Sequence, residues 1–416
     1  MIAQFAIENF RSFKGNNTFS LVATSDKELL ESNTFEGKKN RFLKTAVIYG
    51  ANASGKSNFF KALVFFLNFA VYSAPRKQAG DSTNTEPFVF SRQTESAPSS
   101  FEIIFFVNNQ GIETRYRYSF TISKTQVLEE SLFALYNKRE TMIFKRYLQE
   151  ITCSSAFKEG TRSKSSVRTN CTFLSVCAQN NGVISREIIA YFRNMSVLYG
   201  PATLYNEIIL GNKIKKENKE ANVKFLKCAD FQIIGINTEI VPTLVDIQDD
   251  NGAATVKNMQ YERVEFGHVV YDEENPVAEK YINEDDESAG TQRLYYFSKY
   301  ILGALEEGTA LFIDEFDIML HPLIIEYVIK LFNSSETNPR NAQLVISSHA
   351  VNIMTKKNFR RDQIWFCEKD QYGATDLYSL VEYKEPVRKD ATYNKDYLSG
   401  KYGAIPYLDE LFNKFK

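Results

Sequence analysis

The spacing of apolar and polar residues predicts different structures along the chain. Residues 2–23 alternate as two strands around a turn do, and the run KTAVIYG at 44–50 predicts a buried strand that ends at a glycine. A long apolar helix is expected from Lys56 to about Tyr72. Its most apolar run, 59–74, contains a lysine and is shorter than a membrane-spanning helix. We therefore expect a buried core helix and no membrane segment.

Period-two alternation from Phe88 to about Thr152 predicts an antiparallel sheet. The segments around it are predicted as a polar loop at 74–87, a basic, serine-rich loop at 158–168, helices at 172–197 and 206–231, and strands at 236–270. From Ser288 to the end, helical spacing alternates with apolar strands, as in a parallel sheet.

These patterns predict an α/β protein with a mixed sheet core, an antiparallel β subdomain and a helical insertion. We divide the chain into an N-terminal lobe at 1–152, a mainly helical insertion at 153–235 and a C-terminal lobe at 236–416. The 416 residues hold ample material for such a core.

Charge and cysteine content narrow the function classes. The 50 basic and 51 acidic side chains nearly cancel, so no global positive field indicates nucleic-acid binding. Two local patches are either DNA contacts or solvated faces: Lys158, Arg162, Lys164 and Arg168, or Lys213, Lys215, Lys216 and Lys219. The five cysteines form no C-x-x-C pair and are odd in number. This argues against a disulfide framework or a zinc site and favours a cytoplasmic location.

A candidate phosphate loop, GANASGKSN, lies between the strand at 44–50 and the helix that follows. It fits the pattern G-x-x-x-x-G-K-[ST] through Gly50, Gly55, Lys56 and Ser57. Glycines let successive amides point inward as an anion nest, Lys56 would reach the β- and γ-phosphates, and Ser57 would bind Mg²⁺. The other nucleotide-binding candidates in the loop are Asn52, Ser54 and Asn58. The alternative is a fortuitous glycine-rich turn.

Two further apolar strands end at residues that suit nucleotide hydrolysis. TALFIDEFD carries Asp314, a candidate Mg²⁺ ligand, and Glu315, a candidate base for the attacking water. The alternative is a strand that ends in a solvated acidic turn. AQLVISSHA carries His349 at the carboxyl end of a strand, where ligands bind in α/β sheets. His349 is therefore either a γ-phosphate contact or a structural histidine.

The order of phosphate loop, ESAGTQR, FIDEFD and SSHA resembles the ABC-type ATPase heads of SMC, RecF and OLD-like proteins. The resemblance implies a P-loop NTPase fold of the ABC-head type with ATP and Mg²⁺ as cofactors. It also implies that Ser288 and the amides of Gly290 and Thr291 cap the γ-phosphate of ATP bound to the opposite subunit. The protein would then be a homodimer or higher oligomer with ATP-bridged heads.

Two other segments resemble parts of such heads. IENFRSF at 7–13 is similar to the opening of RecF and SMC heads, so Arg11 is a candidate phosphate or base contact, or a plain surface arginine. In DEFDIMLHP, Asp317 matches the loop that crosses the dimer interface, and His321 lies in the same stretch.

The likeness narrows to bacterial AAA/ABC-type ATPases of the RloA and AbiL kind, with the ATPase subunit of the PARIS defence system as a relative. It rests on AVIYGANASGKSNFFKAL, PFVFS followed by SSFEIIFFV, NCTFLSVCAQ and YLSGKYGAIPYLDEL, and covers most of the chain except about 200–235. Two departures stand out. No glutamine loop is assignable, and the chain has neither a coiled coil of SMC length nor C-terminal room for the nuclease domain of OLD proteins.

These resemblances imply a sensor or scaffold ATPase in anti-phage defence, with a separately encoded nuclease-like effector and a DNA or phage-protein trigger. The alternative is a RecF-like repair or replication ATPase that binds DNA directly. A GTP switch is disfavoured because no N/T-K-x-D tetrad is present.

Overall fold

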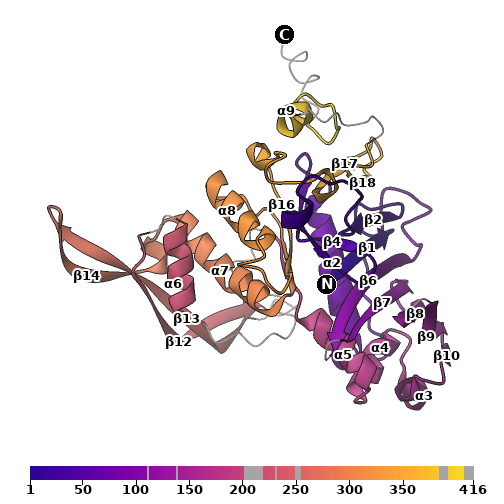
Figure 1. Cartoon of the computed structure of the whole chain (residues 1–416). Helices are drawn as coiled ribbons and strands as arrows, with labels where there is room; N and C mark the ends of the chain where they lie inside the picture. Colours follow the sequence, from indigo (N-terminus) through magenta and orange to yellow (C-terminus); the bar gives the residue numbers. More distant parts are fainter. Residues whose placement is uncertain are drawn as a thin grey trace, which may run out of the picture. The chain divides into compact units, whose positions relative to one another are not determined.

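The structure is a computed structural model of the chain (Figure 1). The residues it describes are 1–109, 112–136, 139–200, 219–229, 232–248, 254–383 and 392–406. Most of the predicted helix at 206–231, three lysines of the second basic patch (Lys213, Lys215 and Lys216) and the last residues of the tail motif lie outside them.

The chain forms two compact units. The core unit holds Met1–Lys213, Ala304–Ile318 and Ile325–Lys416. The second unit holds Ile214–Gly303 and Met319–Ile324. The division into an N-terminal lobe, a helical insertion and a C-terminal lobe stays a prediction.

A six-stranded sheet in the core unit, ordered β11-β15-β16-β5-β17-β18, carries the glycine-rich loop, Asp314, Glu315 and His349 at the carboxyl ends of its strands. Its strands are β5 (Thr45–Tyr49), β11 (Ser196–Leu198), β15 (Ala310–Ile313), β16 (Gln343–Ser347), β17 (Ile364–Lys369) and β18 (Thr375–Ser379). All neighbouring pairs are parallel except β17 and β18. The carboxyl ends of β5, β15 and β16 therefore meet at the same edge. The C-terminal alternation predicts a parallel sheet, and the antiparallel pair β17–β18 makes the sheet mixed, as the predicted fold class has it.

A seven-stranded antiparallel sheet, ordered β10-β9-β8-β7-β6-β1-β2, forms the other layer of the core unit. Its strands are β1 (Ile2–Glu8), β2 (Asn17–Ser20), β6 (Ser99–Asn109), β7 (Ile112–Ile122), β8 (Val127–Tyr136), β9 (Arg139–Tyr147) and β10 (Glu150–Cys153). A short antiparallel pair, β3 (Thr34–Glu36) and β4 (Arg41–Leu43), accompanies it. The antiparallel sheet predicted from period-two alternation is confirmed, although its first strand in that region begins at Ser99 rather than Phe88.

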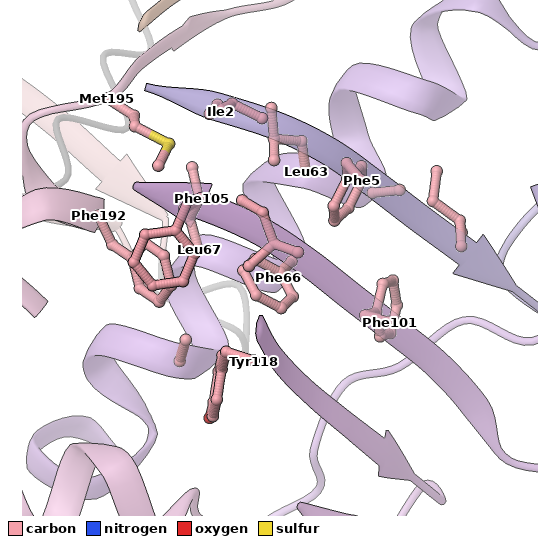
Figure 2. Close-up of a cluster of buried hydrophobic side chains, with 14 of the residues drawn as sticks. Ile2, Phe5, Leu63, Phe66, Leu67, Phe101, Phe105, Tyr118, Phe192 and Met195 are labelled. Atoms are coloured by element: carbon pink, nitrogen blue, oxygen red, sulfur yellow. The ribbon is translucent and has the colours of Figure 1, made fainter. Parts of the chain in front are cut away.

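Helix α2 (Lys56–Arg76) packs against both sheets. Figure 2 shows Phe66 and Leu67 of this helix among Phe5 of β1 and Phe105 of β6. The Phe66 ring stacks on Phe120 of β7 with 5.1 Å between centroids. By length and composition α2 is, among the described helices, the one apolar enough to cross a membrane, but 67% of its most apolar window is buried inside the fold. This is the burial of a core helix, as the sequence predicts.

Two predicted segments after the sheet are corrected by the structure. The loop predicted at 158–168 contains α3 (Lys158–Ser163) and a 3₁₀ turn at Lys164–Ser166. The buried residues within α3 are Gly160 and Ser163, which lack the bulk that hydrophobic periodicity detects. The predicted helix at 172–197 is two helices, α4 (Phe173–Gln179) and α5 (Val183–Arg193), followed by strand β11. Asn181, with φ of 61°, lies between the two helices.

The second unit contains an antiparallel sheet of β12 (Gly235–Gln248), β13 (Ala254–Asp272) and β14 (Asn275–Asn283). Its described residues include α6 (Lys219–Cys228), and α7 (Ala289–Glu307) begins in it. Strands were predicted only as far as residue 270. β14 was missed because nearly all of it is exposed, so it has no buried face to impose apolar alternation. The other α-helices among the described residues are α1 (Leu30–Asn33), α8 (Pro322–Asn333) and α9 (Tyr393–Leu398).

Candidate functional site

The glycine-rich loop connects β5 directly to α2, as the motif predicts. Gly55 has φ of 115°, and a Cβ there would lie 2.2 Å from the Thr375 hydroxyl oxygen. A Cβ on Gly50 would lie 2.4 Å from the Cys367 carbonyl oxygen. A side chain at either position would clash with these atoms, so both positions require glycine. The glycines let the loop pack closely at the N-terminus of α2.

The back of the loop is fixed by a polar network that the sequence did not reveal. The Thr375 hydroxyl donates to the Ser54 carbonyl at 2.8 Å and lies 2.8 Å from the Ser12 hydroxyl. The Asn58 amide donates to Ser12 Oγ at 2.8 Å, and the Thr375 backbone amide donates to the Ser12 carbonyl at 2.7 Å. Ser12 and Thr375 thus tie the N-terminal segment and β18 to the phosphate loop.

Lys56 lies at the start of α2 and is almost fully buried. Its ammonium donates to the carbonyls of Gly50 at 2.8 Å and Ala51 at 3.1 Å, so it lies across the loop. Burial lowers the pKa of Lys56, and the negative charges of Asp314 and Glu315 oppose this shift. The cation therefore gains from any additional anion that enters the loop.

The two acids follow β15 at the same sheet edge. One Asp314 carboxylate oxygen accepts a hydrogen bond from the Ser347 hydroxyl at the end of β16. The other oxygen, Asp314 Oδ2, is buried and has no hydrogen-bond partner. Ser347 Oγ in turn accepts the backbone amide of Glu315 at 2.7 Å, and Glu315 has φ of 51°. Ser347 thereby sets the position of both acids, a role that sequence reasoning missed.

His349 lies two residues beyond β16. Its backbone amide donates to the Asp317 carboxylate at 2.9 Å. Desolvation and the positive charge of Lys56 lower the pKa of His349, against the pull of Asp317 and Glu315. Lys56, Asp317 and Glu315 therefore lie close enough to His349 to act on its charge.

The residues present fit Mg²⁺. Asp314 offers a buried oxygen without a partner, and Ser57 offers a hydroxyl in the first turn of α2. Within the described ranges no cluster of three or more His, Cys, Asp or Glu could hold a metal ion. Mg²⁺ at nucleotide sites is bound through one or two protein oxygens, substrate phosphates and waters, so a larger cluster is not needed.

The residues of the ESAGTQR segment lie in the second unit. Ser288 precedes α7 and caps it, because its hydroxyl accepts the Thr291 amide at 3.1 Å. A Cβ on Gly290 would lie 3.0 Å from the Met319 carbonyl oxygen, so a larger residue there would crowd the backbone. Ser288 is exposed, and Gly290 is half-buried. The segment is therefore a capped helix N-terminus with an accessible hydroxyl.

The remaining candidates are placed as follows. Arg11 pairs with Glu86 at 2.6 Å, and its backbone amide donates to the Glu86 carbonyl at 2.6 Å. Arg168 of the first basic patch donates to the carbonyls of Ala74 and Lys77, so it ties its own segment to the C-terminal end of α2. Asn52 of the phosphate loop is exposed. In the DEFDIMLHP stretch, His321 Nδ1 accepts the Leu323 amide at 3.3 Å.

This geometry agrees with a comparison of the chain with known families. The family described as "AAA domain, putative AbiEii toxin, Type IV TA system" matches residues 46–170 and 232–355, more than half of the chain. The chain belongs to this family. The first matched segment contains the phosphate loop, and the second contains the acids and His349. No curated protein matches the chain. Membership of the AAA family implies nucleoside-triphosphatase activity in general.

Proposed function

We propose that the protein is an Mg²⁺-dependent ATPase of the ABC-head type. The observation that supports this most directly is the gathering of Lys56 and Asp314 at one sheet edge, where Asp314 Oδ2 is buried without a partner. The loop amides and Lys56 bind the phosphates, while Ser57 and Asp314 hold the metal. Bound Mg²⁺ neutralises charge that develops on the phosphate oxygens.

Hydrolysis in this proposal uses the two residues at the ends of β15 and β16. Glu315 accepts a proton from the attacking water. It directly follows the proposed metal ligand, Asp314, and its backbone amide is held by Ser347. His349 contacts the γ-phosphate as a neutral hydrogen-bonding group, since its pKa is lowered. Ser288 and Gly290 of a second subunit complete the site, so the working form is a homodimer or larger homo-oligomer.

In the cell we propose a sensor or scaffold role in anti-phage defence. The family description names a toxin of a type IV TA system, which supports a role in defence. A separately encoded nuclease-like protein would be the cytoplasmic effector, and DNA or a phage protein would be the trigger. The finer assignment to ATPases of the RloA, AbiL and PARIS kind belongs to this proposal and rests on the sequence motifs quoted above.

A direct assay tests the enzymatic part. The purified protein should release phosphate from ATP only when Mg²⁺ is present. Lys56→Ala should abolish ATP binding by removing the buried phosphate cation. Lys61→Ala, further along the same helix, is the matched control and should keep activity. ATP binding at full affinity in Lys56→Ala would exclude the phosphate-loop assignment.

The defence role needs a separate test. Bacteria that carry this gene with its neighbouring reading frame should resist a phage panel, and Lys56→Ala should restore plaque formation. Equal plaque counts with and without the wild-type genes on every phage would contradict the role in defence. They would leave the ATPase assignment intact.

Direct DNA binding is a second candidate, favoured by one hollow in the second unit. This hollow of about 490 Å³ lies between α6 and the β12–β14 sheet and is lined by exposed Lys219, Lys224 and Lys227, with Tyr281. Lysines that contact a nucleic acid neutralise its phosphates and release counterions on binding. Duplex binding that weakens steeply with salt, and less steeply in Lys224→Ala, would support the RecF-like alternative.

A further inference from the structure

An exposed aromatic side chain, Phe90, is held on a rigid loop. The Phe90 side chain is 73% exposed, yet its ring packs edge-to-face on buried Phe88 with 5.7 Å between centroids. The Phe88 amide donates to Asn9 Oδ1 at 3.0 Å. Asn9, which is buried, donates in turn to the carbonyls of Thr94, Ala97 and Pro98. The loop is thus built to hold an apolar ring in solvent, which costs free energy unless a ligand covers it.

This ring lies beside the turn between β17 and β18, which is followed by Thr375, a contact of the phosphate loop. A Cβ on Gly373 would lie 3.1 Å from the Phe90 ring. Gly373 belongs to the turn between β17 and β18, and β17 runs parallel to β5, so the turn extends from the same sheet edge as the phosphate loop. Two residues later, Thr375 contacts Gly55 and Ser54. An extended chain covers at most about 3.6 Å per residue, so Gly373 lies within about 7 Å of Thr375.

The position and the chemistry of the ring suit a nucleobase. A triphosphate held by Lys56 leaves its nucleoside to extend away from the loop, toward a neighbouring surface at this edge. Every base has a π face that stacks on an aromatic ring, and this contact does not depend on base identity. The turn also carries a second exposed aromatic side chain, Tyr372, which is 67% exposed and precedes Gly373 in the chain.

We propose that Phe90 is the platform on which the base of the bound nucleotide stacks. This assignment rests on the proposed function, since it assumes a nucleoside triphosphate in the phosphate loop. Phe90 supplies affinity for the nucleoside half of the ligand, while the loop supplies affinity for the phosphates. Removal of the ring should therefore weaken binding of nucleotides but not of a base-free polyphosphate.

The test compares two probes, ATP and inorganic tripolyphosphate, with Mg²⁺, in a Glu315→Gln background that prevents hydrolysis. Phe90→Ala should raise the Kd for ATP about 5- to 100-fold and leave the Kd for tripolyphosphate unchanged. Tyr147→Ala removes a comparably exposed aromatic side chain from β9. In the seven-stranded sheet, three strands separate β9 from β1, and β1 precedes the Asn9 that anchors the Phe90 loop. This variant should change neither Kd.

Phe90→Trp gives a second readout. The chain has one tryptophan, Trp365, which is buried, so a new exposed indole is readily distinguished. Its fluorescence should be quenched by ATP and not by tripolyphosphate. An unchanged Kd for ATP in Phe90→Ala, or an equal loss for tripolyphosphate, would overturn the platform while the phosphate loop stands. Failure of the parent protein to bind ATP at all would instead refute the proposed function.

Discussion

The Ser347 hydroxyl donates a hydrogen bond to the Asp314 carboxylate, across two neighbouring parallel strands. Ser347 is fully buried, and the same hydroxyl accepts the Glu315 amide. One oxygen of Asp314 is thereby occupied, and the other is left for a different partner. A single serine therefore orients the proposed metal ligand and the proposed base together.

Replacing this serine should impair metal use more than nucleotide binding. Ser347→Ala removes the donor to Asp314 and leaves the Glu315 amide without its acceptor. Loss of such an outer partner typically weakens metal affinity 10- to 100-fold, so the Mg²⁺ concentration for half-maximal hydrolysis should rise by about that factor. Titration of Mg²⁺ at saturating ATP measures the change.

The control for this prediction is Ser334→Ala. Ser334 also accepts a backbone amide, that of Glu336 at 3.2 Å, but it follows α8 at the opposite end from the site. It should leave the Mg²⁺ requirement unchanged. A Ser347→Ala protein with the same Mg²⁺ dependence and the same thermal midpoint as wild type would show that Ser347 does not position the acids.

His349 should make stability depend on pH. Desolvation and Lys56 lower its folded pKa below the ordinary value of 6.5. Between these two values the unfolded chain binds a proton that the folded chain does not, so stability falls as the pH drops through this window and is unaffected above it. His349→Asn should lose less stability than wild type between pH 7.5 and 5.5, as judged by denaturant midpoints. His321→Asn reports the effect of losing an imidazole elsewhere. Equal losses in wild type and His349→Asn would contradict the shift.

A buried ion pair in the core unit should dominate the stability of the region around α4. The Glu130 carboxylate accepts the Tyr118 hydroxyl and the amides of Phe173 and Leu174, and lies 3.6 Å from Arg146. Both charged side chains are fully buried, so Glu130→Ala leaves an unpaired cation and should cost about 3–5 kcal/mol of unfolding free energy.

The neighbouring residue provides the comparison. Glu129 lies on the same strand but is exposed, and Glu129→Ala should change the unfolding free energy by no more than about 0.5 kcal/mol. Urea denaturation of both variants measures the difference. A loss below about 1 kcal/mol in Glu130→Ala would show that the pair is not a net contributor of this size.

Local patterns explain what the sequence predicts well. The phosphate loop is a contiguous motif, and the strands that carry Asp314 and His349 are short apolar runs that end in polar residues. Parallel pairing then brings their ends together without further information. The antiparallel sheet follows for the same reason, because one buried face imposes period two.

The rest of the site depends on contacts that no local pattern encodes. Ser12 and Thr375 meet behind the loop although 363 positions separate them. Ser347 is one more serine at the end of an apolar strand, and only the register of β15 against β16 places it on Asp314. Hydroxyl side chains carry no periodic signal, so such supports emerge only from the folded structure.

Glu315→Gln should separate ATP binding from hydrolysis. The amide keeps the shape of the side chain but cannot accept the proton of the attacking water. The variant should bind ATP, hydrolyse it poorly and, if ATP bridges two heads, associate when ATP is added. Size measurements with and without ATP test this, with Lys56→Ala as the variant that should not respond. The absence of any ATP-induced association or tightening in Glu315→Gln would refute the head-to-head arrangement.

Ser288→Arg tests whether the ESAGTQR segment acts on the nucleotide of a second subunit. The change places a bulky cation at the exposed N-terminus of α7, where a partner's γ-phosphate would dock. Lys56, Ser57 and Asp314 are untouched, so ATP binding should survive while hydrolysis collapses. Loss of ATP binding in Ser288→Arg would mean that the segment belongs to the pocket of its own chain.

Mixing this variant with Lys56→Ala sharpens the test. Each protein alone should be inactive, but a mixed pair contains one intact site, built from the phosphate loop of the Ser288→Arg chain and the ESAGTQR segment of the Lys56→Ala chain. Partial recovery of phosphate release on mixing is expected where subunits exchange and one site can act alone. Mixing Lys56→Ala with Glu315→Gln is the control. Both of these chains keep an intact ESAGTQR segment, but one lacks the phosphate-loop lysine and the other lacks the base. No pairing of them therefore gives a subunit with both a working loop and a base. Recovery in the first mixture and not in the second would require the serine and the lysine to act on the same nucleotide from different chains.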